Sequence, residues 1–128
     1  MKTHSREILI YYNPESSPDR KTVAYAQSVV SHVKSYSFSK NPSSNWSWQM
    51  ILKSMDRHPK ELMNKAHPYY QKHIQGREFD EEGWVNILQK NPQLLKAPIA
   101  VRGTRAILCE SPTDIYQLVR EEENSKTQ

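Results

Sequence analysis

The chain has 128 residues, a formal net charge of +4 and one cysteine, Cys109, which suits a single domain with one core. A lone cysteine excludes an internal disulfide and, without a CxxC pair, excludes dithiol redox chemistry within the chain. No apolar run approaches membrane-spanning length, residues 1–6 lack the apolar part of a signal peptide, and basic residues are interspersed with acidic ones, so we expect a cytoplasmic protein that binds neither membranes nor nucleic acid.

The N-terminal third predicts a strand, a helix and a second strand. Residues 7–12 carry an apolar run typical of a central strand buried on both faces. Ser17 is the predicted cap of a helix over residues 18–34, which begins at a proline. Residues 36–39 alternate and predict a half-exposed strand, so the helix becomes the crossover of a right-handed βαβ unit. The apolar stripe of this helix comprises Val23, Ala26, Val30 and Val33.

The middle of the chain, residues 41–91, predicts helices. Ser44 is placed to cap one helix, and Pro59 and Pro68 each stand where a short helix begins. Asp80 caps another helix, and Phe79 and Trp84 flank this cap as a hydrophobic staple. The remaining apolar positions of these helices are Trp48, Ile51, Leu52, Met55, Ile87 and Leu88.

The C-terminal part predicts a β-hairpin followed by a helix. Residues 99–101 and 106–108 are apolar runs on either side of a turn at Gly103. Pro98 precedes the first strand. The sequence alone does not decide whether the peptide bond before it is cis or trans. We expect a final helix that is capped by Ser111 and runs from Pro112 to about Glu122. It is predicted to pack through Ile115, Leu118 and Val119. Residues 124–128 are predicted to form a disordered tail.

The hairpin and the segment before it resemble the glutaredoxin-dependent arsenate reductase family and its relatives, the Spx regulators. The family segment is P-I-L-I-x-R-P-I-V, and the residues in its places are Pro92, Leu94, Leu95, Lys96, Ala97, Pro98, Ile99, Ala100 and Val101. The resemblance extends from the first strand to the last helix. It implies an α/β, thioredoxin-like fold with a mixed sheet of about four strands, in which residues 1–128 form one domain with core segments 7–40 and 92–122 and a helical insert at 41–91.

The first loop matches the family pattern N-P-x-C-x-x-S-R except at the cysteine. Asn13, Pro14 and Arg20 keep the family's places, whereas Ser16 stands where the cysteine would be. A thiol near a helix N-terminus ionises near neutral pH and forms the mixed disulfide that glutathione or glutaredoxin resolves. A serine hydroxyl does neither, so we expect Ser16 to have no catalytic role.

The resemblance also implies three arginines that hold an oxyanion, and none is present at its place. The positions carry Ala97, Glu110 and, within about one residue, Asn64. Exchanging a cation for an anion at roughly 5 Å changes the interaction with an oxyanion by several kcal/mol at an effective dielectric near 20. We therefore expect arsenate to be rejected from this vestigial site, which consists of Ser16, Arg20, Asn64, Ala97, Pro98 and Glu110.

Two hypotheses, weak anion binding and a purely structural role, concern the polar side chains of the first loop. The backbone N–H groups after Ser16, with Ser17 and Arg20, are candidates for weak phosphate or sulfate binding. The structural alternative makes the serines loop and cap residues and pairs Arg20 with Glu15 or Asp19.

Cys109 is expected to be buried and inert, and the alternative is a relocated monothiol that accepts glutathione, slowed by the negative charge of Glu110. The five histidines show no metal-ligand spacing, and we expect no metal or cofactor.

Two functional hypotheses follow. The first is a binding or regulatory module without reductase activity, because the Spx relatives act by binding the RNA polymerase α subunit. Its predicted partner site is the basic insert segment, residues 53–77. The second is a glutathione- and glutaredoxin-linked oxidoreductase of the arsenate reductase type that uses Cys109. The oligomeric state is left open.

Overall fold

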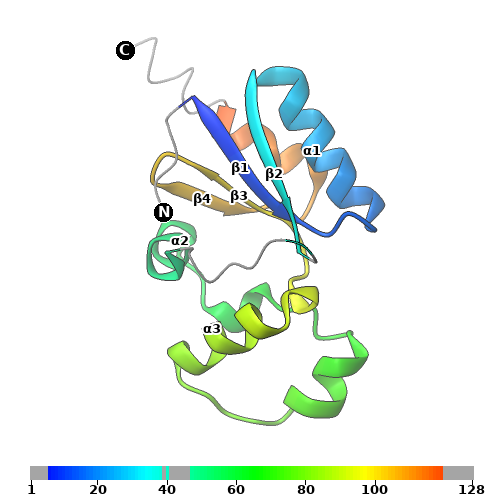
Figure 1. The fold of residues 1–128 in the computed structure, drawn as a ribbon. Coiled ribbons are helices and arrows are strands. Elements are labelled where there is room, and N and C mark those ends of the chain that lie inside the picture. Colours follow the sequence, from blue (N-terminus) through cyan, green and yellow to red (C-terminus); the bar gives the residue numbers. More distant parts are fainter. Residues whose placement is uncertain (1–5, 39, 41–46, 120–128) are drawn as a thin grey trace.

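The computed structural model describes residues 6–38, 40 and 47–119. Four strands form one mixed sheet in the order β2-β1-β3-β4 (Figure 1). The strands are β1 (Glu7–Tyr12), β2 (His32–Ser37), β3 (Ile99–Arg102) and β4 (Arg105–Leu108). β1 pairs parallel with β2 and antiparallel with β3, which pairs antiparallel with β4. The α/β, thioredoxin-like mixed sheet predicted from the sequence is thus confirmed.

The central strand β1 is buried on both faces, as its apolar run predicts. Leu9 and Tyr11 belong to a large cluster with residues of the helical insert. Ile8 and Ile10 point to the other face and pack in a second cluster with α1 (Ser17–Val29) and the C-terminal helical turn η4 (Pro112–Ile115). This alternation follows from the two-residue period of a strand. Figure 1 shows α1 on one side of the sheet and α2 (Trp48–Met55) on the other.

The predicted boundaries of α1 and β2 are wrong. Ser16, not Ser17, caps α1, and the helix ends at Val29 instead of reaching residue 34. Val30 has extended backbone angles, φ −129° and ψ 132°. Val33, predicted in the helix, lies in β2 opposite Ile8. Val33 is β-branched, and such residues fit strands better than helices. Its pairing with β1 stabilises the strand at this position. β2 therefore spans residues 32–37 instead of the predicted 36–39.

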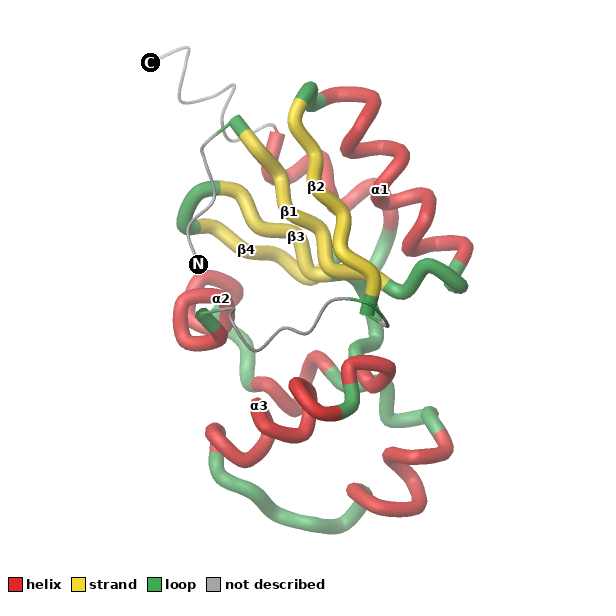
Figure 2. Tube along the Cα trace, viewed as in Figure 1, coloured by secondary structure: helices red, strands yellow, loops and turns green. Residues whose placement is uncertain are grey.

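The insert consists of short helices, as predicted, and Figure 2 shows them below the sheet. α2 is capped by Ser47, which accepts the Met50 N–H at 3.3 Å, and the predicted cap, Ser44, lies outside the described residues. Helical turns begin at Pro59 and Pro68 as expected. These segments include η1 (Pro59–Leu62) and the π-helical turn η2 (Tyr70–Ile74), and α3 (Glu81–Lys90) follows them.

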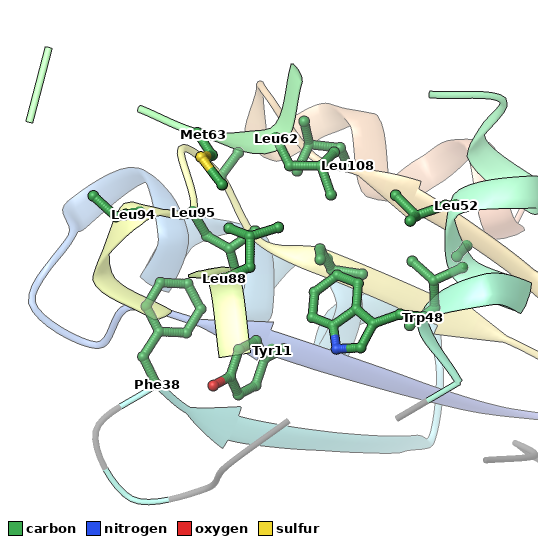
Figure 3. Packing of buried hydrophobic residues seen from close by; sticks show 14 of the residues in the cluster. Tyr11, Phe38, Trp48, Leu52, Leu62, Met63, Leu88, Leu94, Leu95 and Leu108 are labelled. Carbon is green, nitrogen blue, oxygen red and sulfur yellow. The ribbon is translucent and has the colours of Figure 1, made fainter. Parts of the chain in front are cut away.

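The predicted cap and staple of α3 are confirmed. Asp80 accepts the Gly83 N–H at 2.7 Å. The rings of Phe79 and Trp84 meet edge to face with centroids 4.9 Å apart. Figure 3 shows the adjoining core, where Trp48, Leu62 and Leu88 close over the face of the sheet that carries Tyr11.

The C-terminal half follows its predicted order. The turn η3 (Pro92–Leu94) leads into the β3–β4 hairpin, whose turn residue Gly103 has φ +63°. The peptide bond before Pro98 is trans, as are all others in the described residues. Ser111 and Asp114 form a capping box at η4, and residues 116–119 continue as helix. The predicted end of this helix near residue 122 and the tail at 124–128 lie outside the described residues.

Candidate functional site

The loop between β1 and α1 is closed by its own side chains. Ser16 is half-buried and caps the helix by accepting the Asp19 N–H at 3.3 Å. Its hydroxyl donates to the Asp19 carboxylate at 3.0 Å, and the Asn13 N–H donates to the other carboxylate oxygen at 2.9 Å. A further turn is fixed because the Glu15 N–H donates to the Asn13 side-chain oxygen at 3.0 Å. The position that resembles the family's cysteine therefore holds a structural cap.

Asp19 is the site residue that sequence reasoning missed. It is only 7% exposed and stands where the family pattern N-P-x-C-x-x-S-R has its serine. Burial raises the pKa of Asp19, and the hydrogen bonds from Asn13 and Ser16 partly oppose that shift. The exchange of the pattern's serine for a carboxylate was the available signal. A carboxylate at this helix N-terminus takes donors that would otherwise serve an external anion.

Ser17 and Arg20, the other members of the predicted weak anion site, are exposed on the first turn of α1. The Arg20 guanidinium donates to the Pro14 carbonyl oxygen at 2.9 Å. The structural alternative is confirmed for Ser16, which caps α1. The ion pair that it expected between Arg20 and Glu15 or Asp19 is absent from the described residues, so that part is wrong.

The three positions that resemble the family's arginines lie in different surroundings. Ala97 is 5% exposed and belongs to the apolar cluster of the insert face, and Pro98 beside it is also buried. The Asn64 side-chain oxygen accepts the Ala66 N–H at 3.1 Å. Glu110 is the only charged group among the three and lies on the surface.

The charge of Glu110 is balanced by two cations that sequence reasoning left out. Lys96 lies 3.0 Å from its Oε1 oxygen, and Arg57 lies 3.3 Å from the same oxygen. The hydrogen bond from Lys96 is the main cause that lowers the pKa of Glu110. Arg57 is far away in the sequence, so the pairing depends on the fold. The repulsion predicted for an oxyanion near Glu110 is offset by these partners.

Cys109 is buried, as predicted, with 2% of its surface exposed. Its N–H donates to the Pro98 carbonyl oxygen at 2.8 Å, which places the end of the hairpin beside the vestigial site. Burial raises the Cys109 pKa to about 12, with smaller contributions from the charges of Asp114 and Asp19. Glu110 is not among the causes of this shift, so the prediction that its negative charge slows this thiol is wrong.

A pocket of about 270 Å³ adjoins the β1–α1 loop, and its wall is partly apolar. It is lined by Asn13, Pro14, Glu15, Phe38, Pro92 and Gln93. No cysteine, histidine or basic side chain is among these lining residues, so the hollow offers neither a nucleophile nor a cation to a substrate.

Two other kinds of site were sought in the described part of the chain. It holds no group of three or more histidine, cysteine, aspartate or glutamate side chains arranged to bind a metal ion. Within the same residues, every helix is too short or too polar to cross a membrane.

Comparison with known proteins agrees with the fold described above. The model of the ArsC family matches residues 11–118. The chain is 21% identical over 117 residues to the "Uncharacterized protein YfgD" of Escherichia coli K12, covering 90% of this chain and 98% of that protein. Among solved structures, an arsenate reductase from Vibrio cholerae is 16% identical with a TM-score of 0.77, covering 88% of this chain and 97% of the other. A structure from Yersinia pestis is 23% identical with a TM-score of 0.71, covering 87% and 99%.

Proposed function

This chain belongs to the ArsC family, and we propose that it is a member without reductase activity that acts by binding a partner protein. The observation that carries the first half of this proposal is the closed loop at the N-terminus of α1, where Ser16 bonds to the buried Asp19. A hydroxyl cannot form the mixed disulfide that a thiol-dependent reductase needs. The neighbouring carboxylate disfavours both an anionic nucleophile and an anionic substrate at the same place.

Cys109 gives the competing hypothesis, a monothiol oxidoreductase that uses glutathione. Its burial and its pKa of about 12 oppose that role. At pH 7 a thiol with this pKa is a thiolate for only about one molecule in 10⁵, and the thiolate is the reactive form. We therefore place the reductase second to the binding module.

The experiment that separates the two is arsenate- and glutathione-dependent NADPH oxidation in a glutaredoxin-coupled assay. We expect no turnover above the rate without the protein, both for the natural chain and for Cys109→Ser. Turnover that disappears in Cys109→Ser would establish the monothiol reductase. Turnover that survives this change would require a nucleophile other than sulfur and would overturn both hypotheses.

We propose the insert segment 53–77 as the partner surface, in a cytoplasmic setting. Tyr69 is one of the two large apolar side chains that are clearly exposed in the described residues, at 36%. Its ring lies 4.7 Å from that of His73, and the neighbouring Lys72 is exposed. An exposed aromatic residue beside a cation suits an acidic protein surface with an apolar centre.

A pull-down from cell extract with the tagged chain tests this surface. We expect a stoichiometric partner that is lost with Tyr69→Ala combined with Lys72→Glu. Lys21→Glu, an exposed charge reversal on α1, is the matched control and should retain the partner. Equal recovery with both variants, or the absence of any stoichiometric partner, would contradict this assignment.

A further inference from the structure

The sheet has one edge that α2 covers and one that lies open among the described residues. At the covered edge, the Ala106 N–H of β4 donates to the Ser54 hydroxyl oxygen of α2 at 2.8 Å. β2 forms the other edge, as Figure 2 shows, and its exposed residues are His32, Lys34 and Ser35. An edge strand of this kind presents main-chain donors and acceptors with which another strand can pair.

The outward main-chain groups of β2 belong to alternate residues. The Phe38 N–H donates to the Tyr12 carbonyl oxygen of β1 at 2.9 Å. Main-chain groups of successive strand residues alternate in direction, so the even-numbered residues of β2 face β1. Val33 and Ser35 therefore direct their N–H and C=O groups away from the sheet. No described residue forms a hydrogen bond with these outward groups.

The sequence of β2, HVKSYS, is self-complementary about Ser35. When a second β2 runs antiparallel with the two Ser35 residues opposite each other, Val33 lies opposite Ser37 of the second copy, and outward groups meet outward groups. Lys34 then lies opposite Tyr36 of the second copy on the same face, where an ammonium group and an aromatic ring attract each other. The neighbouring register, centred on Lys34, is disfavoured because it places two like charges opposite each other.

Neither charge nor α1 obstructs this pairing. The Lys34 ammonium group lies 3.4 Å from the Glu7 carboxylate of β1, so its charge is balanced within the chain. α1 packs on a face of the sheet, since its buried residues Val23 and Ala26 share a cluster with Ile10 of β1. The edge is therefore accessible to a strand of another molecule within the part of the chain that the structure describes.

We propose that β2 pairs with β2 of a second copy of this chain, antiparallel and centred on Ser35, so that two four-stranded sheets join into one. A second copy is the occupant because a two-fold axis at Ser35 satisfies the outward groups of Val33 and Ser35 in both chains at once. The same symmetry places Lys34 beside an aromatic ring and not beside its own counterpart. This surface is separate from the insert segment 53–77 and goes beyond the partner proposed there.

Sedimentation equilibrium of the full chain over a range of concentrations tests the pairing. We expect a reversible equilibrium between monomer and dimer. Ser35→Pro removes the outward N–H and should raise the dissociation constant about thirtyfold, the effect of losing two ordinary hydrogen bonds. Proline is tolerated on an edge strand where its nitrogen faces outward, so the pairing with β1 is kept. Ser35→Ala is the matched control, because it retains the N–H and should leave the dissociation constant unchanged.

Ser35→Lys keeps the test decisive if circular dichroism shows that Ser35→Pro does not fold. This change places two like charges opposite each other on the axis, at a position that is exposed in the monomer. It should raise the dissociation constant about fivefold at low ionic strength, and less in high salt. Equal constants for Ser35→Lys and Ser35→Ala would overturn the proposal.

Cross-linking tests the register. Opposite residues of a hydrogen-bonded antiparallel pair have Cα atoms about 5.5 Å apart, a separation that suits a disulfide. Ser35→Cys should therefore give a disulfide-linked dimer on air oxidation. His32→Cys is the matched control on the same strand, because in this register it lies about 20 Å from its own counterpart and should stay unlinked. Cys109 is buried in both variants. Equal cross-linking of the two variants would overturn the register.

Two further outcomes would overturn the second copy as the occupant. One is a chain that stays monomeric up to roughly 1 mM. The other is protection of the Val33 and Ser35 amides from hydrogen exchange in a chain that sediments as a monomer, which would assign the edge to another segment of the same chain. Tyr69→Ala with Lys72→Glu should leave the dimer unchanged, so this pairing and the proposed function fail separately.

Discussion

Replacing Asp19 tests the closed loop on which the proposed absence of reductase activity depends. Asp19→Ala removes the acceptors of the Asn13 N–H, at 2.9 Å, and of the Ser16 hydroxyl, at 3.0 Å. Two hydrogen bonds to a charged, buried group are worth about 3 kcal/mol. Relief of the unfavourable burial of that charge offsets part of this loss. We expect a net loss of about 2 kcal/mol in the free energy of unfolding.

Asp19→Asn separates the hydrogen bonds from the charge. The amide can accept the Asn13 N–H and donate to Ser16, so the loop keeps its bonds and loses the ionised group. Because the Asp19 pKa is raised in the folded chain, ionisation favours unfolding, and the stability that this group contributes is present below its unfolded value of 3.8 and is lost as the pH rises through the folded pKa. Asp19→Asn should therefore gain stability relative to the natural chain as the pH rises from about 3 to 7.

The assay is urea denaturation followed by tryptophan fluorescence, which reports the buried Trp48 and Trp84. Glu15→Ala is the matched control, because it removes an exposed carboxylate from the same loop. It should change stability by less than about 0.5 kcal/mol. Equal destabilisation by Asp19→Asn and Asp19→Ala would refute the reasoning, since it would show that the charge holds the loop despite its burial.

Three further outcomes are expected. Ser16→Cys alone should give a thiol with no depressed pKa, whereas Ser16→Cys combined with Asp19→Ser should have a lower thiol pKa. Thiolate ultraviolet absorbance measures both pKa values. Equal pKa values in the two variants would contradict the role of the Asp19 carboxylate. Cys109 should resist a thiol reagent in the native chain at pH 8 and react once urea unfolds it, and rapid native labelling would disprove its inertness. Glu110→Gln should cost less than about 1 kcal/mol near neutral pH, because the pair with Lys96 is half-exposed. Since the Glu110 pKa is lowered, this cost should vanish as the pH falls through its folded pKa, and a cost that persists in acid would exclude the ion pair as its cause.

The sheet was predictable from local pattern because its strands are strongly apolar. β1 and the β3–β4 hairpin contain runs of apolar residues, which are more stable when buried than when exposed to water. Gly103 supplies the positive φ of the turn. The boundary between α1 and β2 was not predictable, since Val30 and Val33 fit a helical stripe as well as a strand. Only the pairing of Val33 with Ile8, a tertiary contact, decides the outcome.

The sequence alone predicts which residue types the candidate site lacks. It does not predict how the residues that are present interact with one another. The missing cysteine and arginines are visible at Ser16, Ala97 and Glu110. The hydrogen bonds of Asp19 and the pairing of Glu110 with Arg57 are visible only in the folded chain. The Asp19 hydrogen bonds depend on the burial of a loop carboxylate, and the Glu110–Arg57 pair joins residues 53 positions apart. No periodic pattern in the sequence predicts either interaction.

Ala97 stands at a position that resembles one of the family's arginines, and a cation is present one residue away from it. Ala97 is buried among apolar side chains of the insert face, whereas Lys96, one residue earlier, reaches the surface and pairs with Glu110. Lys65 stands in the same relation to Asn64, with the cation one position away from the residue that resembles the family's arginine. Positive charge is therefore present next to both of these positions, on Lys96 and on Lys65.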